Sequence, residues 1–354
     1  MSVKFNKYEL TKALVRDLGN LNGLHDVTEE ISRIDPMPKL ISAIINPAPR
    51  YLQTKVFEHD VTVRKNALPS DKAYGERGQM IDARPVTDTH LLSVPSYGLQ
   101  AQVRPEDVLR RRKHGTTDQL LAEQEVVAEE KASLMRAWDL FREKSLAHSI
   151  VTGTNYVPNS SLPAVDFYQE YTGTSRPVVT FTLSNTTVHP KTYGEEARRR
   201  ILDNLNDGEE VSGFMMLCGK NFWNSLTTHP QWTQAMIDRA GLNNQDPLIK
   251  RFENFSEQYQ MIRFADNTVY VEAGGYIGGS VLIPDDEAYL IPLGVNLFTE
   301  YFAPAETKSY INTVAQPAYM WEVSDEFKGT ELYTESNRIL VPHNPLLIQK
   351  CVRA

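Results

Sequence analysis

The sequence is poor in cysteine and has no long apolar run. Its two cysteines, Cys218 and Cys351, stand far apart and belong to no paired motif, which excludes a disulfide framework and disfavours a zinc site built on cysteine. No apolar stretch approaches the roughly 18 residues of a membrane-spanning helix. The N-terminal sequence MSVKFNKYELTKALV is polar and charged, without the apolar core of a signal peptide. We therefore expect a chain that folds in a reducing cytoplasm.

The sequence also lacks an excess of positive charge. It has 45 acidic and 37 basic side chains, a net charge of -8. A protein that mainly binds nucleic acid phosphates carries a concentrated basic face, so this class is disfavoured, whereas a container whose inner wall does not adhere to DNA is compatible. A hydrophobic content of 41% over 354 residues predicts one large domain or two intertwined smaller ones.

Catalytic motifs are missing as well. The eight histidines show no HxxH or HExxH spacing, and GxSxG is absent. The GGYIGG segment at 274–279 lacks the Lys-Ser/Thr of a P-loop and lies between two expected strands, which favours a hairpin turn. The acidic run 285–287 fits a solvated turn better than a cation site. The sequence therefore predicts a protein that is not an enzyme, with no cofactor and no metal.

The strongest positive signal is one long amphipathic helix. Thr116 and Gln119 form a capping box, which satisfies backbone amides at a helix start. The expected core face comprises Leu120, Val127, Leu134, Trp138 and Phe141, widened by Leu121, Ala128 and Met135. The polar remainder includes Glu129, Glu130 and Glu143. No glycine or proline intervenes before Gly153, so the helix should be about 50 Å long. A coiled coil would need a partner heptad, and none is visible, so we expect the helix to lie across a sheet.

Around this helix the pattern predicts a mixed α+β chain. Strand patterns cover 54–63 and 89–103, and the polar loop between them, 64–85, is long for a compact domain. A projecting functional hairpin is favoured there over a floppy connector. Later expectations are strands in VDFYQEY, PVVTFTL and GFMMLCG, helices over 192–205 and NFWNSLTTHPQW, and an antiparallel meander in 259–292. The last fifty residues hold further strand patterns.

A basic cluster precedes the long helix. Arg104, Arg110, Arg111, Arg112 and Lys113 lie within ten residues that contain only two acids, Glu106 and Asp107. We expect contacts between subunits or with packaged DNA, and a solvated face is the alternative. The further candidates for contact between subunits come from the 64–85 loop and are Lys72, Glu76 and Arg77.

The order of these parts resembles the Hong Kong 97 fold of tailed-phage major capsid proteins. The sequence itself resembles the capsid protein E family typified by phage lambda. The matching stretches are VRPEDVLRRRKHG with the helix behind it, SGFMMLCGKNFWNSLTTHP, DNTVYVEAGGYIGG and the closing GTELYTESNRILVPHNPLLIQKCV. The resemblance spans nearly the whole chain and rests on the collinear order of these stretches.

The resemblance implies a division of the chain and a function. The N-terminal arm would be 1–50, the E-loop hairpin 51–115, the spine helix and P-domain 116–207, the A-domain 208–298, and returning P-domain strands 299–354. It implies an icosahedral shell of hexamers and pentamers that encloses double-stranded DNA without reading its sequence. It also implies a scaffold protein, a portal, a decoration protein, no membrane, and assembly in the host cytoplasm into the virion. An encapsulin-type bacterial compartment is the alternative.

Overall fold

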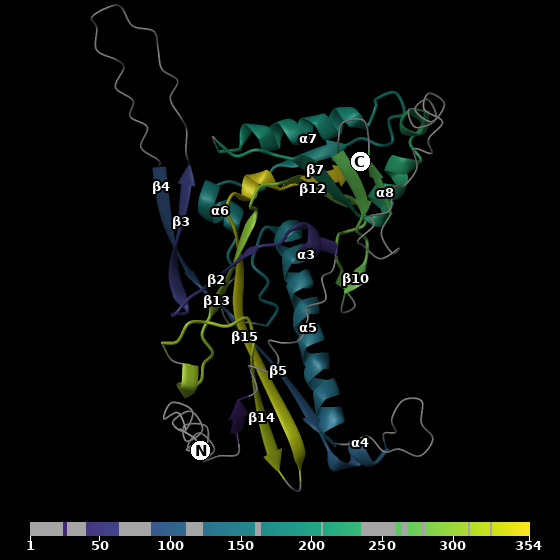
Figure 1. Cartoon of the computed structure of the whole chain (residues 1–354). Helices are drawn as coiled ribbons and strands as arrows, with labels where there is room; N and C mark the ends of the chain where they lie inside the picture. Colours follow the sequence, from purple (N-terminus) through teal and green to yellow (C-terminus); the bar gives the residue numbers. More distant parts are fainter. Residues whose placement is uncertain are drawn as a thin grey trace, which may run out of the picture.

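Two six-stranded sheets and one long helix, α5 (Glu123–Thr152), form the framework of the described chain (Figure 1). The computed structural model describes residues 24–26, 40–63, 86–110, 123–159, 164–206, 208–234, 260–263, 268–277, 280–310, 312–325 and 328–354. In Figure 1 the first sheet runs alongside α5, and the second lies at the C-terminal end of the helix. The predicted α+β class is confirmed.

The first sheet is organised around its longest strand, β15 (Gly329–Pro342). Its other strands are β1 (Leu24–Asp26), β2 (Ala48–Tyr51), β5 (Ser96–Val103), β13 (Phe298–Ala303) and β14 (Tyr319–Asp325). β5 pairs antiparallel with one edge of β15, while β14 and then β13 pair with the other edge. The 14 residues of β15 span about 46 Å, which is about the length of the 30-residue helix beside it.

The second sheet has the order β6-β16-β12-β7-β9-β8. Its strands are β6 (Val178–Phe181), β7 (Gly213–Cys218), β8 (Met261–Arg263), β9 (Thr268–Glu272), β12 (Glu287–Leu293) and β16 (Gln349–Arg353). The central strands β7 and β12 are buried almost throughout. This explains their unbroken apolar sequences, because a strand covered on both faces has no solvent side. α7 (Lys191–Asp203) covers the sheet in Figure 1 and contacts β6, β12 and β16.

The strand order differs from the expected meander in 259–292. β9 and β12 are not neighbours, because β7 lies between them and pairs parallel with β9 and antiparallel with β12. The meander prediction is therefore wrong. The C-terminal strand β16 also lies here, between β6 and β12, whereas β14 and β15 belong to the first sheet. Alternation shows that a segment is a strand, but not which strand lies next to it.

The segment VDFYQEY is a helix and not the predicted strand. α6 (Phe167–Thr172) begins where the Asp166 side chain accepts hydrogen bonds from the backbone N–H groups of Tyr168 (3.0 Å) and Gln169 (3.3 Å). It ends at Gly173, whose φ of 63° suits glycine. The aromatic residues indicated a strand, but the N-terminal cap of Asp166 favours helix locally.

A two-stranded hairpin of β3 (Val56–Val63) and β4 (Val86–Ser93) stands beside the first sheet. The strands pair antiparallel with Val63 opposite Val86. One face buries Phe57, His59 and Leu92, while Leu91 on the other face is exposed. The glycine-rich segment forms the expected hairpin of β10 (Tyr276–Ile277) and β11 (Ser280–Val281). The smaller helices used below are α3 (Leu40–Ile44), α4 (Pro105–Arg110) and α8 (Lys220–Thr227).

Candidate functional site

The long helix α5 packs one apolar face on the first sheet. Of the predicted face, Val127, Leu134 and Trp138 are buried, Phe141 is half-buried, and Leu120 lies outside the described residues. The buried three form one cluster with Met320 of β14 and Leu332 of β15. The indole Nε1 of Trp138 donates a hydrogen bond of 2.9 Å to Thr334 Oγ1. The helix therefore lies across a sheet, with its side chains fixed by both packing and hydrogen bonds.

Two details of the predicted helix are wrong. Ala128 is exposed, and Val126 takes the buried place next to Val127. Glu143, which the sequence places on the polar face, is completely buried. A repeat of seven residues drifts around a straight helix of 3.6 residues per turn, so the buried face rotates along α5. The capping box of Thr116 and Gln119 lies outside the described residues.

Glu143 fixes the chain that leads into β2. Its carboxylate accepts hydrogen bonds from the backbone N–H groups of Ile41 (2.7 Å) and Ser42 (2.9 Å) in α3. The first amides of a helix lack partners within it, and a carboxylate satisfies them well. A buried carboxylate is otherwise costly, so this contact explains how Glu143 is tolerated inside the protein.

A buried cluster of ion pairs joins α5 to β13 and β15. Glu300 lies between two arginines, with Arg142 Nε 3.0 Å from its Oε2 and Arg338 Nη1 3.5 Å from its Oε1. Arg338 also donates to Ser336 Oγ at 2.8 Å and stands 5.5 Å from the ring centroid of Trp138. Burial lowers the pKa of Arg338, and the Glu300 carboxylate opposes that shift. The arginine remains charged, so Glu300 must balance it.

The C-terminal end of α5 is fixed to the second sheet. Arg176 donates hydrogen bonds to the carbonyl oxygens of Ile150 (2.7 Å) and Val151 (2.8 Å) and stacks over the ring of Tyr289 in β12. The Tyr289 hydroxyl donates to the same Val151 carbonyl at 3.3 Å. The last carbonyls of a helix lack partners within it, and a cation there also complements the helix dipole. α5 is thus anchored to both sheets, one near each end.

The β3–β4 hairpin is attached to the first sheet through aromatic contacts. The rings of Phe57 and Tyr301 stack with centroids 4.3 Å apart, and His59 Nδ1 lies 3.1 Å from the Tyr301 hydroxyl. We call this contact of Phe57 and His59 with Tyr301 the hairpin joint. Close by, Lys55 forms an ion pair with Glu306 and donates to Ser96 Oγ at 2.6 Å.

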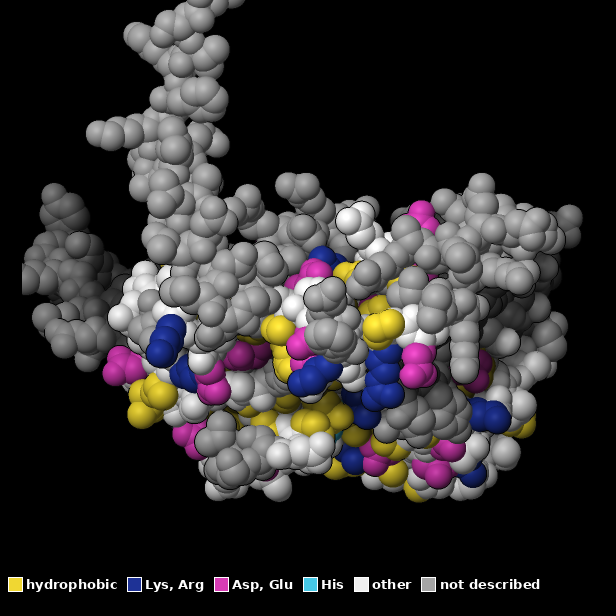
Figure 2. Space-filling view, turned by 90° about the horizontal axis from the view of Figure 1, so that it is seen from below, with side chains coloured by type: hydrophobic (Ala, Val, Ile, Leu, Met, Phe, Trp, Pro, Cys, Tyr) yellow, Lys and Arg dark blue, Asp and Glu magenta, His cyan; other side chains and the backbone are white. Residues whose placement is uncertain are grey.

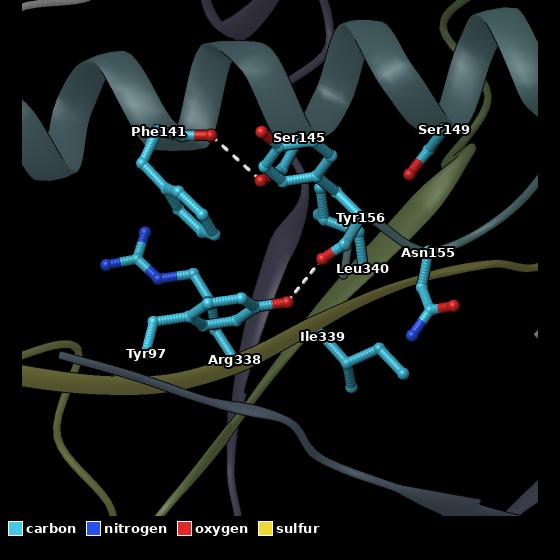
Figure 3. A pocket seen from close by; sticks show the side chains of 9 residues that line it. All are labelled: Tyr97, Phe141, Ser145, Ser149, Asn155, Tyr156, Arg338, Ile339 and Leu340. Atoms are coloured by element: carbon cyan, nitrogen blue, oxygen red, sulfur yellow. Dashed lines mark hydrogen bonds between the residues drawn. The ribbon is translucent and has the colours of Figure 1, made fainter. Parts of the chain in front are cut away.

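A small pocket lies between α5 and β15 (Figure 3). Its volume is about 10 Å³, room for about one water molecule. Tyr97 donates from its hydroxyl to the Tyr156 carbonyl, and Ser145 donates to the Phe141 carbonyl at 2.8 Å. The Ser149 hydroxyl has no hydrogen-bond partner among the described residues. The pocket is too small for an organic cofactor.

The predicted contact residues lie mostly outside the described chain. Arg104 is exposed between β5 and α4, where its backbone N–H donates to Asp107 Oδ2 at 3.1 Å. Arg110 ends α4, but its side chain is not described. The remaining candidates, Arg111, Arg112, Lys72, Glu76 and Arg77, lie outside the described residues. Figure 2 shows basic and acidic side chains interspersed over the described part of one face.

Among the described residues, no group of three or more His, Cys, Asp or Glu side chains is arranged to hold a metal ion. Likewise, no helix in the described ranges is long and apolar enough to cross a membrane. Cys218 and Cys351 are free thiols buried in β7 and β16, and burial raises the pKa of both.

Comparisons with known proteins give one consistent result. A family model described as phage major capsid protein E matches residues 23–352. The major capsid protein of Pseudomonas phage KPP10 is 28% identical over 275 residues, which cover 73% of this chain and 76% of that protein. A protein assigned as a prophage capsid protein of E. coli CFT073 aligns over 100% of both chains with a TM-score of 0.56 at 11% identity. The capsid of Ralstonia phage GP4 gives 0.50 at 9% identity, over 90% of this chain and 92% of that one.

Proposed function

The chain belongs to the phage major capsid protein E family, and we propose that it forms hexamers and pentamers of an icosahedral shell around the double-stranded DNA of a tailed phage. The family, the capsid fold and the role as a major capsid protein are confirmed predictions, because the family model covers residues 23–352. The encapsulin-type alternative is not favoured by these matches. The similarity to phage capsid proteins supports assembly from many copies of the chain. The formation of hexamers and pentamers and the enclosure of double-stranded DNA are the parts that we propose.

The anchoring of α5 supports this proposal. A shell subunit contacts several neighbours at once, and rings of subunits close through heterologous contacts that tolerate little bending. Packing and the Glu300 ion pairs hold one part of α5 to the first sheet, and Arg176 holds its end to the second. We infer that α5 is the spine that keeps the subunit rigid under such contacts.

The proposed division of the chain follows the capsid fold. Residues 1–50 are the N-terminal arm, 51–115 the E-loop with β3 and β4 as its stem, and 116–207 the spine helix and P-domain. The A-domain is 208–298, and 299–354 return to the P-domain. β16 qualifies this division, since it pairs with β12 and β6 in the second sheet.

The proposed partners are further copies of the chain, a scaffold protein, a portal and a decoration protein. The net charge of -8 and the interspersed charges of Figure 2 support a wall that encloses DNA without binding a particular sequence. We propose a purely structural role in the virion, with assembly in the host cytoplasm.

We propose that the basic residues before α5 act between subunits. The proposed contact set is Arg104, Arg110, Arg111, Arg112, Lys72, Glu76 and Arg77. The exposure of Arg104 and the acidic balance of the chain support contact with acidic side chains of neighbours over contact with DNA. Changing Arg110, Arg111 and Arg112 together to glutamine should impair the assembly of empty particles. Normal empty shells with a defect confined to DNA-filled ones would assign the cluster to the genome instead.

Electron microscopy and sedimentation of the expressed chain test the proposed function. The chain should be expressed alone and together with the proteins encoded beside it in its genome. Rings of five or six subunits, tubes or closed shells are the expected products. A protein that remains monomeric under both conditions would contradict the proposal. If the genes beside this one encode a cargo enzyme and no portal, the encapsulin alternative would be favoured.

A further inference from the structure

Histidines gather where the β3–β4 hairpin meets the body of the protein. His59 comes from β3 and His90 from the facing position of β4. The His59 ring centroid lies 6.2 Å from that of His343, which follows β15. Tyr171 of α6 stacks on His59 at 6.0 Å and packs on His90 at 4.8 Å. Residues of β3, β4, α6 and the segment after β15 thus lie together beside the hairpin joint.

His59 is the buried centre of this group. Its exposed fraction is 5%. Nδ1 is within hydrogen-bond distance of the Tyr301 hydroxyl, whereas Nε2 has no hydrogen-bond partner among the described residues. A protonated imidazole would need acceptors for both nitrogens. The joint therefore fits neutral His59, and none of the carboxylates in the described ranges forms an ion pair or hydrogen bond with this ring.

The charged groups around His59 are mostly basic. The basic groups that face it are Arg50 of β2, His90 of β4 and His343, and the opposing acid is Asp60 of β3. Asp60 and Arg50 are both exposed, so water screens both of these charges. The other nearby acids act on other histidines: Glu170 lies 3.1 Å from His90 Nδ1, and Glu209 acts on His343. Protonation of His59 would thus bury a positive charge that Asp60 compensates only weakly.

The pKa directions agree with this geometry. Burial above all, with contributions from His343, His90 and Arg50 and with Asp60 opposing, lowers the pKa of His59 to about 4. Burial and Arg50 also lower the pKa of His343. An imidazole in the open chain titrates near 6.5. Both rings are therefore neutral when the hairpin is attached and take up protons more readily when it is released.

We propose that the hairpin joint is acid-sensitive, so that protonation of His59 and His343 releases the β3–β4 hairpin while both large sheets stay folded. The sign follows from proton linkage. Attachment is at full strength above about pH 6.5, where both states are neutral at His59. As the pH falls from 6.5 through about 4, the released state binds more protons, and attachment weakens by up to about tenfold per pH unit for one histidine.

The hairpin can respond separately because it pairs with itself alone. Among the described residues, β3 and β4 form a two-stranded unit outside both large sheets. It contacts the body through Phe57 and Leu92, which pack with Phe167, Tyr301 and Ile339. A two-stranded hairpin is at best marginally stable without such support. Weakening the joint should therefore expose the hairpin amides before those of the second sheet.

Hydrogen exchange of the full chain, followed by mass spectrometry between pH 7.5 and pH 4.5, tests this inference. Labelling times are scaled for the intrinsic pH dependence of exchange. Peptides over 56–63 and 86–93 should lose at least tenfold protection towards pH 4.5, while peptides over 213–218 and 287–293 retain theirs. Unchanged hairpin protection, or simultaneous loss in all four regions, would overturn the proposal.

Matched variants identify the titrating residue. His59→Gln keeps an acceptor for Tyr301 but cannot be protonated, so its hairpin should stay protected at pH 4.5. His148→Gln is the control, because burial also lowers the pKa of His148 but this residue lies on α5. It should respond to pH like the unaltered protein. If His59→Gln does not fold, His343→Gln should still shift the loss of protection to lower pH. If both His59→Gln and His343→Gln lose hairpin protection at the same pH as the unaltered protein, the proposal is refuted. This outcome does not depend on whether the chain assembles into shells.

Discussion

Glu143 and Ile41 are 102 positions apart in sequence, yet Glu143 Oε1 accepts a hydrogen bond of 2.7 Å from the backbone N–H of Ile41. The contact ties the long helix α5 to the short helix α3. It places a fully buried carboxylate where two backbone amides need an acceptor. The carboxylate thereby helps to hold α3, which precedes β2, against α5.

Removing this carboxylate should destabilise the subunit. Glu143→Ala leaves the amides of Ile41 and Ser42 buried without acceptors, which costs about 1–3 kcal/mol in the free energy of unfolding. Glu143→Gln retains one carbonyl oxygen and should cost less. Urea unfolding of the full chain measures both, with Glu129→Ala at an exposed position of the same helix as the control. A loss for Glu143→Ala no larger than that of the control would show that the contact contributes little.

The apolar face of α5 offers a comparison between two leucines. Leu134 is 8% exposed within the cluster on the first sheet, whereas Leu140 is 39% exposed. Leu134→Ala should lower the free energy of unfolding by about 2–5 kcal/mol because it leaves a cavity. Leu140→Ala should change it by about 0.5 kcal/mol or less. Leu134→Asp should yield insoluble or non-assembling protein. Equal tolerance at the two leucines would mean that the helix buries a different face.

Neutralising Glu300 should destabilise the protein, because the charge of Arg338 then stays buried without its partner. In Glu300→Gln the guanidinium of Arg338 stays buried without a balancing charge, an expected loss of about 3–5 kcal/mol. Arg142→Gln should cost less, since Arg142 is 28% exposed. The double change Glu300→Leu with Arg338→Met removes both charges and should recover part of the loss. Thermal unfolding of the single and double variants measures the coupling. Additive losses would indicate that the two residues do not interact.

The loop 64–85 should be dispensable for folding and required for stable shells. Val63 and Val86 are paired neighbours at the end of the hairpin, so an Asn-Gly turn can join β3 to β4 directly. The shortened chain should show unchanged urea unfolding and a large loss of particles by sedimentation. A Gly/Ser loop of the original length is the control that separates loop sequence from loop length. Loss of soluble folded protein would contradict the interpretation of the loop as a projection.

Several elements were predictable because their signals are local. The uninterrupted apolar pattern before Gly153 is enough to predict a helix that lies on a sheet. The apolar runs of β7 and β12 predict buried strands, and the absence of glycine and proline inside α5 leaves no point for a break. The collinear order of these stretches also predicts the capsid family. The strand prediction for 165–171 was wrong although the deciding signal is also local, because the N-terminal cap provided by Asp166 was overlooked.

The sequence by itself determined the long helix and three of its buried positions, Val127, Leu134 and Trp138, because periodicity reports on each segment alone. Its resemblance to known capsid sequences indicated the family. Tertiary structure decided the place of β7 between β9 and β12, the burial of Glu143 and the surroundings of His59. A glutamate in a helix is exposed by default, and nothing near position 143 indicates that Ile41 supplies its partner. Likewise, His59 and His343 become neighbours only when the hairpin packs on the first sheet. Contacts between residues so distant in sequence depend on the whole fold, since no local pattern specifies which surfaces meet.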